Sequence, residues 1–219
     1  MTTENRKQKT EIGKSSSISD IRHPTSVFHG FTLIETMVAV TILAFAVAGP
    51  LFTASRVVVA AQTARDQLTA SYLAQEGIEY VRTMRDNEYL SSYKARGTNI
   101  SGVAWTNFLT GGNRSSITAC RTTTCTLDPA RGMGSGSGFS LQQCSGNSCG
   151  PLYLANGIYT QRNDIAGSVK TIFTRTIQVV DITNTPGEHP DKRVVSTVSW
   201  NFHGVPRSVT VSNHITPWQ

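Results

Sequence analysis

Four cysteines are the residues whose type and spacing most directly suggest chemistry. They form two pairs with the same spacing, Cys120-x4-Cys125 and Cys144-x4-Cys149, in a region rich in glycine and serine. Four thiols could hold a structural zinc ion, although the tightest zinc-binding turns place two residues between ligands rather than four. The same thiols could instead form two disulfides, for which three connectivities exist. The spacing alone leaves both a metal site and disulfides open.

One carboxylate stands out because of its surroundings. Glu35 is the only charged residue between Phe31 and Ser55. A carboxylate within an apolar helix is costly unless it is paired or neutralised, so such a residue is a functional candidate. The plainer alternative is that Glu35 lies at the level of the lipid headgroups, solvated and without a function.

The sequence contains no recognisable catalytic constellation. A P-loop, an H-E-x-x-H motif and paired histidines are all absent from it. The isolated histidines are interpreted as surface residues: His189, His203 and His214. Aspartates near turns are interpreted as bonding their own backbone, with a calcium site as the alternative: Asp164, Asp181 and Asp191. The sequence therefore predicts a protein that is not an enzyme and that has no cofactor.

The charge balance gives no direct support for nucleic-acid binding. The 219 residues carry 20 Lys and Arg against 14 Asp and Glu, a formal net charge of +6, without a run of five basic residues. Three arginines near the cysteines, Arg114, Arg121 and Arg131, could form a weak patch for an anionic ligand. We favour the interpretation that they are scattered charges that aid solubility.

An apolar segment, residues 31–55, must position Glu35. As a helix it would span about 37 Å at about 1.5 Å per residue, enough to cross a bilayer core of about 30 Å. Residues 1–30 before it are polar and are predicted to be disordered. A buried core helix and a secretory signal peptide are the alternatives, but the segment is longer than the apolar part of a signal peptide. Within it, Gly49-Pro50 predicts a kink or local unwinding.

The following segment, residues 56–88, has the pattern of an amphipathic helix. An apolar stripe recurs at steps of three, four or six residues: Ala61, Ala64, Leu68, Tyr72, Ile78 and Val81. A single helix is therefore predicted from about Phe31 to Asn87, with a lipophilic first half and a second half packed on a sheet.

The rest of the chain divides into a loop-rich region and a β region. Residues 89–167 hold turn signals and all four cysteines, so regular elements there should be short. Residues 168–219 alternate as an antiparallel sheet of at least three strands, with Val169–Ile182 as one strand and a hairpin turn at His203-Gly204. The sheet should cover Leu68, Tyr72, Ile78 and Val81 of the helix. The apolar face of the sheet that makes this contact should consist of Val194, Val198, Trp200, Val209, Val211 and Ile215. The predicted fold class is α+β.

The junction between the leader and the apolar helix resembles the prepilin processing site of type IV pilins and type II secretion pseudopilins. The resemblance consists of Gly30 before the cut, Phe31 after it and Glu35 four residues further on, in the sequence GFTLIE. It implies that a prepilin peptidase removes residues 1–30 and methylates the new amino group of Phe31. It also implies that Glu35 pairs with the Phe31 amine of a neighbouring subunit and sets the register of the filament. Pro50 is similar to the helix-kinking proline of pilins.

Topology bears on the state of the cysteines. A basic leader ahead of an apolar helix predicts a cytoplasmic N-terminus and a C-terminal portion outside the cytoplasm. Thiols oxidise there, so disulfides are favoured over zinc. Among the three connectivities we favour the local pairs Cys120–Cys125 and Cys144–Cys149, because each closes a short loop at little entropic cost.

The function favoured by the sequence is that of a minor pilin of a type IV pilus. The segment EGIEYVRTMRDNEYL, which begins at Glu76, resembles V-type minor subunits. The expected partners are other pilin subunits, the prepilin peptidase, an inner-membrane assembly platform and, before assembly, the lipid bilayer. The expected location is a single-pass membrane protein and, after processing, an extracellular pilus filament. A type II secretion pseudopilin and a non-polymerising, membrane-anchored adhesin or receptor domain are the alternatives.

Overall fold

The computed structural model of the chain describes residues 30–111, 117–135, 139–146, 148–182 and 191–217. The contacts divide the chain into two units, Met1–Phe52 and Thr53–Gln219. Three predicted features lie outside the described residues: all of the leader except Gly30, together with Arg114 and His189.

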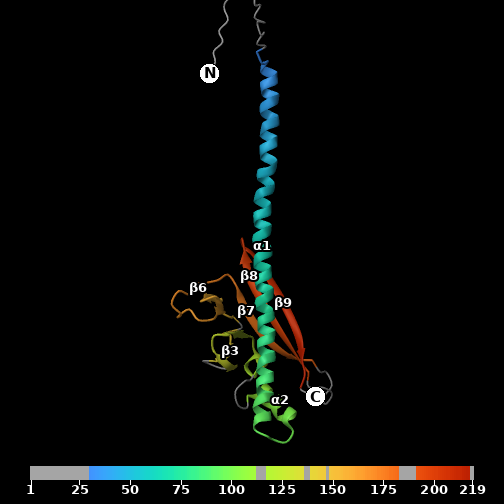
Figure 1. The fold of residues 1–219 in the computed structure, drawn as a ribbon, viewed down its shortest axis with the longest axis vertical. Coiled ribbons are helices and arrows are strands. Elements are labelled where there is room, and N and C mark those ends of the chain that lie inside the picture. Colours follow the sequence, from blue (N-terminus) through green and yellow to red (C-terminus); the bar gives the residue numbers. More distant parts are fainter. Residues whose placement is uncertain (1–29, 112–116, 136–138, 147, 183–190, 218–219) are drawn as a thin grey trace, which may run out of the picture. The chain divides into compact units, whose positions relative to one another are not determined.

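One long helix, α1 (Leu33–Lys94), dominates the N-terminal part of the chain (Figure 1). It ends later than the predicted end at Asn87, because residues 88–94 contain no glycine or proline. The chain leaves the helix just before Arg96, whose φ of 52° is left-handed, and Gly97. Pro50 lies inside α1 and the helix is unbroken there, so the predicted local unwinding is absent from this structure. Proline removes only its own backbone donor, and the flanking helical bonds remain.

The second unit contains two sheets. A six-stranded sheet has the order β2-β3-β1-β7-β8-β9, in which only the β2–β3 pair is parallel. A three-stranded antiparallel sheet has the order β5-β4-β6. The strands are β1 (Cys125–Leu127), β2 (Gly132–Ser135), β3 (Phe139–Gln143), β4 (Tyr153–Ala155), β5 (Ile158–Thr160), β6 (Val169–Lys170), β7 (Thr174–Asp181), β8 (Lys192–Phe202) and β9 (Val205–Ile215). Together with α1, they confirm the predicted α+β architecture.

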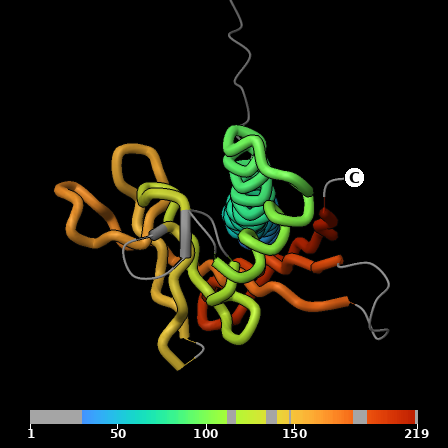
Figure 2. The backbone as a smooth tube through the Cα atoms, turned by 90° about the horizontal axis from the view of Figure 1, so that it is seen from below, coloured from blue at the N-terminus to red at the C-terminus, as the bar shows by residue number. Residues whose placement is uncertain are grey.

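The C-terminal hairpin forms where the alternating pattern predicts it. Strands β8 and β9 pair antiparallel over their whole length, from Lys192 opposite Ile215 to Phe202 opposite Val205. The turn residues His203 and Gly204 both have positive φ, of 50° and 82°, as the two central residues of a type I′ turn require. Figure 2 shows these strands, in orange and red, beside the green part of α1.

The predicted strand Val169–Ile182 is in fact two strands in different sheets. Its first residues form β6 and pair with β4, while β7 begins only at Thr174 and pairs with β8. The break follows from Thr171, whose backbone amide and side-chain hydroxyl both donate to the carbonyl oxygen of Leu152, at 2.9 and 2.7 Å. These bonds attach this stretch to the loop before β4.

The seam by which α1 packs on the sheet also differs from the predicted stripe. Ile78 and Val81 are buried as expected, but four members of the stripe are exposed: Ala61, Ala64, Leu68 and Tyr72. The buried seam instead consists of Ala70, Leu73, Ala74, Gly77, Ile78, Val81 and Met84. Three of these seven residues, Ala70, Ala74 and Gly77, are small, and they lie where the helix backbone approaches the strands closely. A Cβ atom at Gly77 would lie 2.6 Å from both Ile177 Cδ1 and Ser196 Oγ.

The loop-rich region contributes more to the core than its composition predicts. It contains α2 (Ile100–Thr110) and the short α3 (Ala119–Thr122) as well as strands β1 to β5. Asn99 caps α2 by accepting a hydrogen bond from the Gly102 amide at 3.2 Å, and Gly111 ends it in the left-handed conformation. Trp105 and Phe108 of α2 enter the same apolar core as Ile78, Val81 and Met84 of α1. These caps are sequence signals for α2, an 11-residue helix that the prediction of short elements in residues 89–167 did not specify.

Candidate functional site

The predicted cleavage position lies in exposed, non-helical backbone. Gly30, Phe31 and Thr32 precede α1 and have no regular secondary structure, and all three are exposed. Among the described residues other than its chain neighbours, no atom lies within 4 Å of the position that a Cβ at Gly30 would take. Because these residues are exposed and outside the helix, the described structure leaves the backbone on this side of the predicted cleavage position accessible.

Thr32 and Glu35 define where α1 begins. The Thr32 hydroxyl accepts a hydrogen bond from the Glu35 amide at 3.3 Å, and the Thr32 carbonyl accepts one from the Thr36 amide at 3.1 Å. A threonine followed three residues later by glutamate is the capping-box pattern of helix N-termini. Glu35 therefore stands in the first turn, where the helix dipole favours negative charge. The T-x-x-E spacing of Thr32 and Glu35 is the sequence signal for this cap, and the prediction of a helix from about Phe31 did not use it.

The first part of α1 presents apolar side chains on all sides. Every residue from Gly30 to Phe52 is exposed, including Phe31, Ile42 and Phe45. Its threonine hydroxyls are satisfied internally, because Thr36 and Thr41 donate to the carbonyl oxygens of Leu33 and Val38 at 2.8 Å. By length and composition α1 is apolar enough to cross a membrane, with a mean hydropathy of 2.1 over 18 residues. Such a surface needs a lipid or protein environment.

The junction between the leader and α1 matches a known protein-family model. Residues 26–49 match the model of the prokaryotic N-terminal methylation motif. The motif indicates a type IV pilin-like chain. Pilins and pseudopilins are processed, structural subunits, so the motif implies contact with a prepilin peptidase and with other pilin subunits. The single apolar helix near the N-terminus fits a membrane-anchored pilin. Neither a curated protein nor a solved structure matches the chain significantly.

The cysteines are joined in the two local pairs that we favoured. Cys120–Cys125 and Cys144–Cys149 are disulfides, with Cα–Cα distances of 5.2 and 4.7 Å. The two bonds lie in different surroundings. Cys120 and Cys125 are fully buried in the core between α2, α3 and the sheet, whereas Cys144 and Cys149 are only half-buried at the end of β3.

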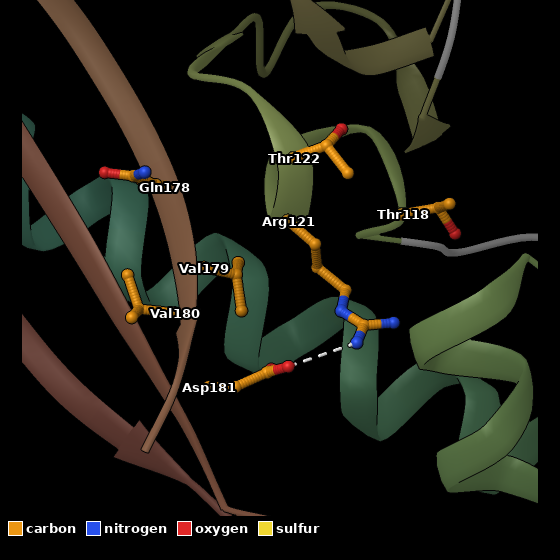
Figure 3. A pocket seen from close by; sticks show the side chains of 7 residues that line it. All are labelled: Thr118, Arg121, Thr122, Gln178, Val179, Val180 and Asp181. Carbon is orange, nitrogen blue, oxygen red and sulfur yellow. Dashed lines mark hydrogen bonds and ion pairs between the residues drawn. The ribbon is translucent and has the colours of Figure 1, made fainter. Parts of the chain in front are cut away.

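The arginines of the loop-rich region are held by carboxylates. Arg121 of α3 reaches across a cavity of about 560 Å³ to Asp181 at the end of β7, 3.3 Å away (Figure 3). Arg131 binds Asp128 at 3.1 Å. Because both guanidinium groups face carboxylates, the hypothesis of a patch for an anionic ligand loses its support.

Asp164 and Asp181 are likewise engaged with cations. Asp164 accepts two hydrogen bonds from Arg162, at 3.0 and 2.9 Å, and Asp181 binds Lys192 at 3.0 Å as well as Arg121. The hydrogen bond from Lys192 is the main reason why the pKa of Asp181 lies below its ordinary value. Within the described part of the chain, no three metal-ligating side chains gather into a group. His203 lies in the hairpin turn, with its ring 4.4 Å from that of Phe202.

Two buried charged side chains, Arg175 and Asp128, bond elements of the second unit to one another, and no local sequence pattern predicts them. Arg175 of β7 is fully buried and donates hydrogen bonds to Glu76 of α1, to the carbonyl oxygen of Leu73 at 3.1 Å and to that of Leu127 at 2.8 Å. Burial lowers the pKa of Arg175, an effect that the negative charge of Glu76 opposes. Nearby, buried Asp128 accepts a hydrogen bond from Thr160 of β5 at 2.7 Å.

Proposed function

We propose that this chain is a minor pilin of a type IV pilus. It is made as a membrane-inserted precursor, cleaved after Gly30 and methylated on the new amino group of Phe31. The observation that carries the proposal is the prepilin motif at the start of a helix whose apolar first part, up to Phe52, has all its side chains exposed. Such a helix is stable in lipid and, after extraction from the membrane, among other subunits.

Glu35 is the proposed assembly residue. Cleavage after Gly30 places a cationic amine directly before the Thr32 cap, at the positive end of the helix dipole. A carboxylate in the first turn offsets that unfavourable charge in the free subunit. In the filament, Glu35 would pair with the Phe31 amine of a neighbour, which fixes the axial register of the incoming subunit. Pro50 is the proposed position at which α1 bends or loses helicity in that packing.

The proposed topology follows the charge of the leader. Residues 1–29 carry more basic than acidic side chains, so the N-terminus remains cytoplasmic and the second unit lies outside the cytoplasm. The two disulfides agree with an oxidising compartment. An inner-membrane assembly platform and the lipid bilayer are the further partners in this scheme, and an extracellular filament is the final location.

Two alternatives predict different outcomes. A type II secretion pseudopilin would be processed identically but would be confined to a short filament within the envelope. A membrane-anchored adhesin or receptor domain would keep its leader and would not need Glu35.

The experiment is to determine the N-terminus and location of the protein extracted from its native envelope. Intact-mass measurement should find a chain that starts at methylated Phe31, and sheared surface filaments should contain it. A mature chain that still begins near Met1 would overturn the proposal. A processed chain that never leaves the envelope would favour the pseudopilin.

A further inference from the structure

Strand β9 ends the six-stranded sheet, and only one of its two edges is paired. That edge bonds β8 along the whole strand without a bulge. Within the described residues, neither a strand nor a backbone hydrogen bond lies at the other edge. With 11 residues, β9 is about twice as long as a usual strand. The sheet therefore ends in a long row of backbone groups that no described part of the chain bonds.

The turn geometry shows which residues of β9 carry these free groups. In a hairpin with a two-residue type I′ turn, the pair that flanks the turn exchanges both backbone hydrogen bonds, and bonded pairs then alternate along the ladder. Phe202 and Val205 flank the turn, so Val205 and every second residue after it bond β8. The backbone groups of the residues between them point away from the sheet: Pro206, Ser208, Thr210, Ser212 and His214. All of these except the proline offer both a donor and an acceptor.

The edge of β9 lacks most of the features by which proteins block exposed strands. Such features are lysine side chains, prolines, bulges and a short strand. β9 contains no lysine, its register with β8 is continuous, and its one proline, Pro206, lies next to the turn. Val209 and Val211 favour the extended backbone and are only partly buried. An open edge of this kind is the surface to which an extended peptide adds as a further strand.

The charges around this edge indicate the chemistry of the added strand. Residues 192–215 contain no acidic side chain, and Lys192 is already paired with a carboxylate of β7. Arg193 and Arg207 are exposed, and neither forms an ion pair within the described part of the chain. Arg207 lies on the face of the sheet that packs on α1, whereas Arg193 lies opposite His214 on the other face. An added strand with a carboxylate at each end would therefore meet positive side chains on both faces.

A second copy of this chain does not fit the edge. Antiparallel pairing of two β9 strands requires a twofold axis perpendicular to the sheet, and this rotation reverses every direction within the plane of the sheet. The buried seam of α1 follows the sheet from Ala70 to Met84 (Figure 1). Two such copies would therefore point their α1 helices in opposite directions, which chains anchored in one membrane cannot do.

From the free edge and its charges, we infer that β9 binds an extended, acidic peptide segment of another protein, added antiparallel to the sheet. Its acidic residues lie seven positions apart, because Arg207 and His214 are seven residues apart on β9. Its apolar residues lie opposite Val209 and Val211 and continue the face that packs on α1. This site is separate from the processing junction at Gly30, so cleavage there does not decide whether the site exists.

A synthetic peptide tests the acidic register. The peptide Glu-Thr-Thr-Val-Thr-Val-Thr-Glu places its glutamates opposite His214 and Arg207. Titrated to about 1 mM against the detergent-solubilised full chain, it should bind at least about tenfold more tightly than the same peptide with lysine for both glutamates. Arg207→Glu should abolish this preference. Lys170→Glu, at an exposed residue of the other sheet, is the control and should preserve it. Equal binding of the two peptides by the wild type, or binding of neither, overturns the inference.

Hydrogen exchange distinguishes strand addition from a purely electrostatic contact. In the free chain the amides of Ser208, Thr210 and Ser212 should exchange quickly, while those of Val209 and Val211 are protected by their bonds to β8. Saturation with the glutamate peptide should slow exchange of the first three by at least about tenfold and leave the two valines unchanged. Binding without this alternating protection, measured residue by residue by NMR, overturns the inference.

Two substitutions at Thr210 provide a matched pair. Thr210→Pro removes an outward N–H without removing a bond to β8. Thr210→Val keeps that N–H and loses only the hydroxyl that lies 3.0 Å from the hydroxyl of Thr197. The glutamate peptide should bind the valine variant within about twofold of wild type and a folded proline variant at least about tenfold more weakly.

The same variants test the competing occupant. Unchanged peptide binding by the folded proline variant overturns the inference. Light scattering that shows self-association of the wild type, abolished by Thr210→Pro, also overturns it, because the edge would then belong to a second copy. If thermal unfolding shows that the proline variant is not folded, the exchange pattern of the wild type decides.

Discussion

Arg175 in β7 and Glu76 in α1 form an ion pair across the seam between the sheet and the helix, and the side chain of Arg175 is completely buried. The same guanidinium also binds carbonyl oxygens of α1 and β1, at Leu73 and Leu127. One side chain therefore ties together three elements that are far apart in sequence. A buried cation is tolerated only when such partners replace its water.

The first prediction is that Glu76→Ala destabilises the second unit by about 2 kcal/mol, because it leaves the buried Arg175 cation without its carboxylate. Glu79→Ala on the same helix is the control. Its ion pair with Arg82 is largely exposed, so its loss should change the free energy of unfolding by less than about 1 kcal/mol. Urea unfolding of the detergent-solubilised chain measures both, and equal effects would contradict the role given to Arg175.

The second prediction concerns the close approach at Gly77. Helix propensity alone would make Gly77→Ala stabilising by about 1 kcal/mol. The added Cβ would meet Ile177 and Ser196, both fully buried, so we expect net destabilisation of about 1–3 kcal/mol. Gly49→Ala, in the same helix, adds a Cβ with no described atom within 4 Å outside the helix's own neighbouring backbone, so it should leave unfolding of the second unit unchanged. A stabilised Gly77 variant would show that the seam is looser than described.

The third prediction is a pH dependence that arises from Asp181. Lys192, and then Arg121, hold the pKa of its carboxyl below the ordinary value of 3.8. Since the folded pKa is lower than the unfolded one, the carboxylate stabilises the fold above about pH 3.8 and stops doing so as the pH falls through the folded pKa. The thermal unfolding temperature of Asp181→Asn should therefore be lower than that of the wild type at pH 6. The two temperatures should converge near pH 2. A difference that persists undiminished at low pH would refute this.

The fourth prediction separates the two disulfides. Cys144 and Cys149 are half-buried, so a mild reductant should open this pair in the folded protein and allow alkylation of both thiols. Cys120 and Cys125 are fully buried, so their disulfide should resist reduction until the protein unfolds. Replacing both Cys120 and Cys125 by Ala should cost about 2 kcal/mol from the lost loop constraint alone. Peptide mapping after graded reduction distinguishes the pairs, and simultaneous alkylation of all four thiols would contradict the assignment.

The fifth prediction concerns Glu35→Ala. Removing a carboxylate from the apolar segment should make membrane insertion easier, by about 2 kcal/mol or more. Cleavage after Gly30 should persist, because the carboxylate lies away from the scissile bond. Assembly should fail, since the Phe31 amine of a neighbour would enter an apolar filament core without a counter-charge. The processed variant should accumulate in the membrane, and wild-type levels in sheared filaments would rule out the pairing role.

Local features could be predicted from the sequence because each depends on residues within a few positions of one another. The processing motif at Gly30, the apolar character of α1 and the hairpin turn at His203-Gly204 each depend on neighbouring residue types. The local disulfide pairs belong to the same class, since short loops close at little entropic cost.

Tertiary structure alone decided which face of α1 is buried. Ala70, Ala74 and Gly77 carry little apolar surface, so hydrophobic periodicity ranked them below Leu68 and Tyr72. Close approach to the strands selects small side chains, and that selection appears only once helix and sheet are together. The same holds for Arg175, which alternates onto the buried face of β7 beside Ile177 and Val179. A cation can occupy that position because Glu76, 99 residues earlier in the chain, is brought to it by the fold.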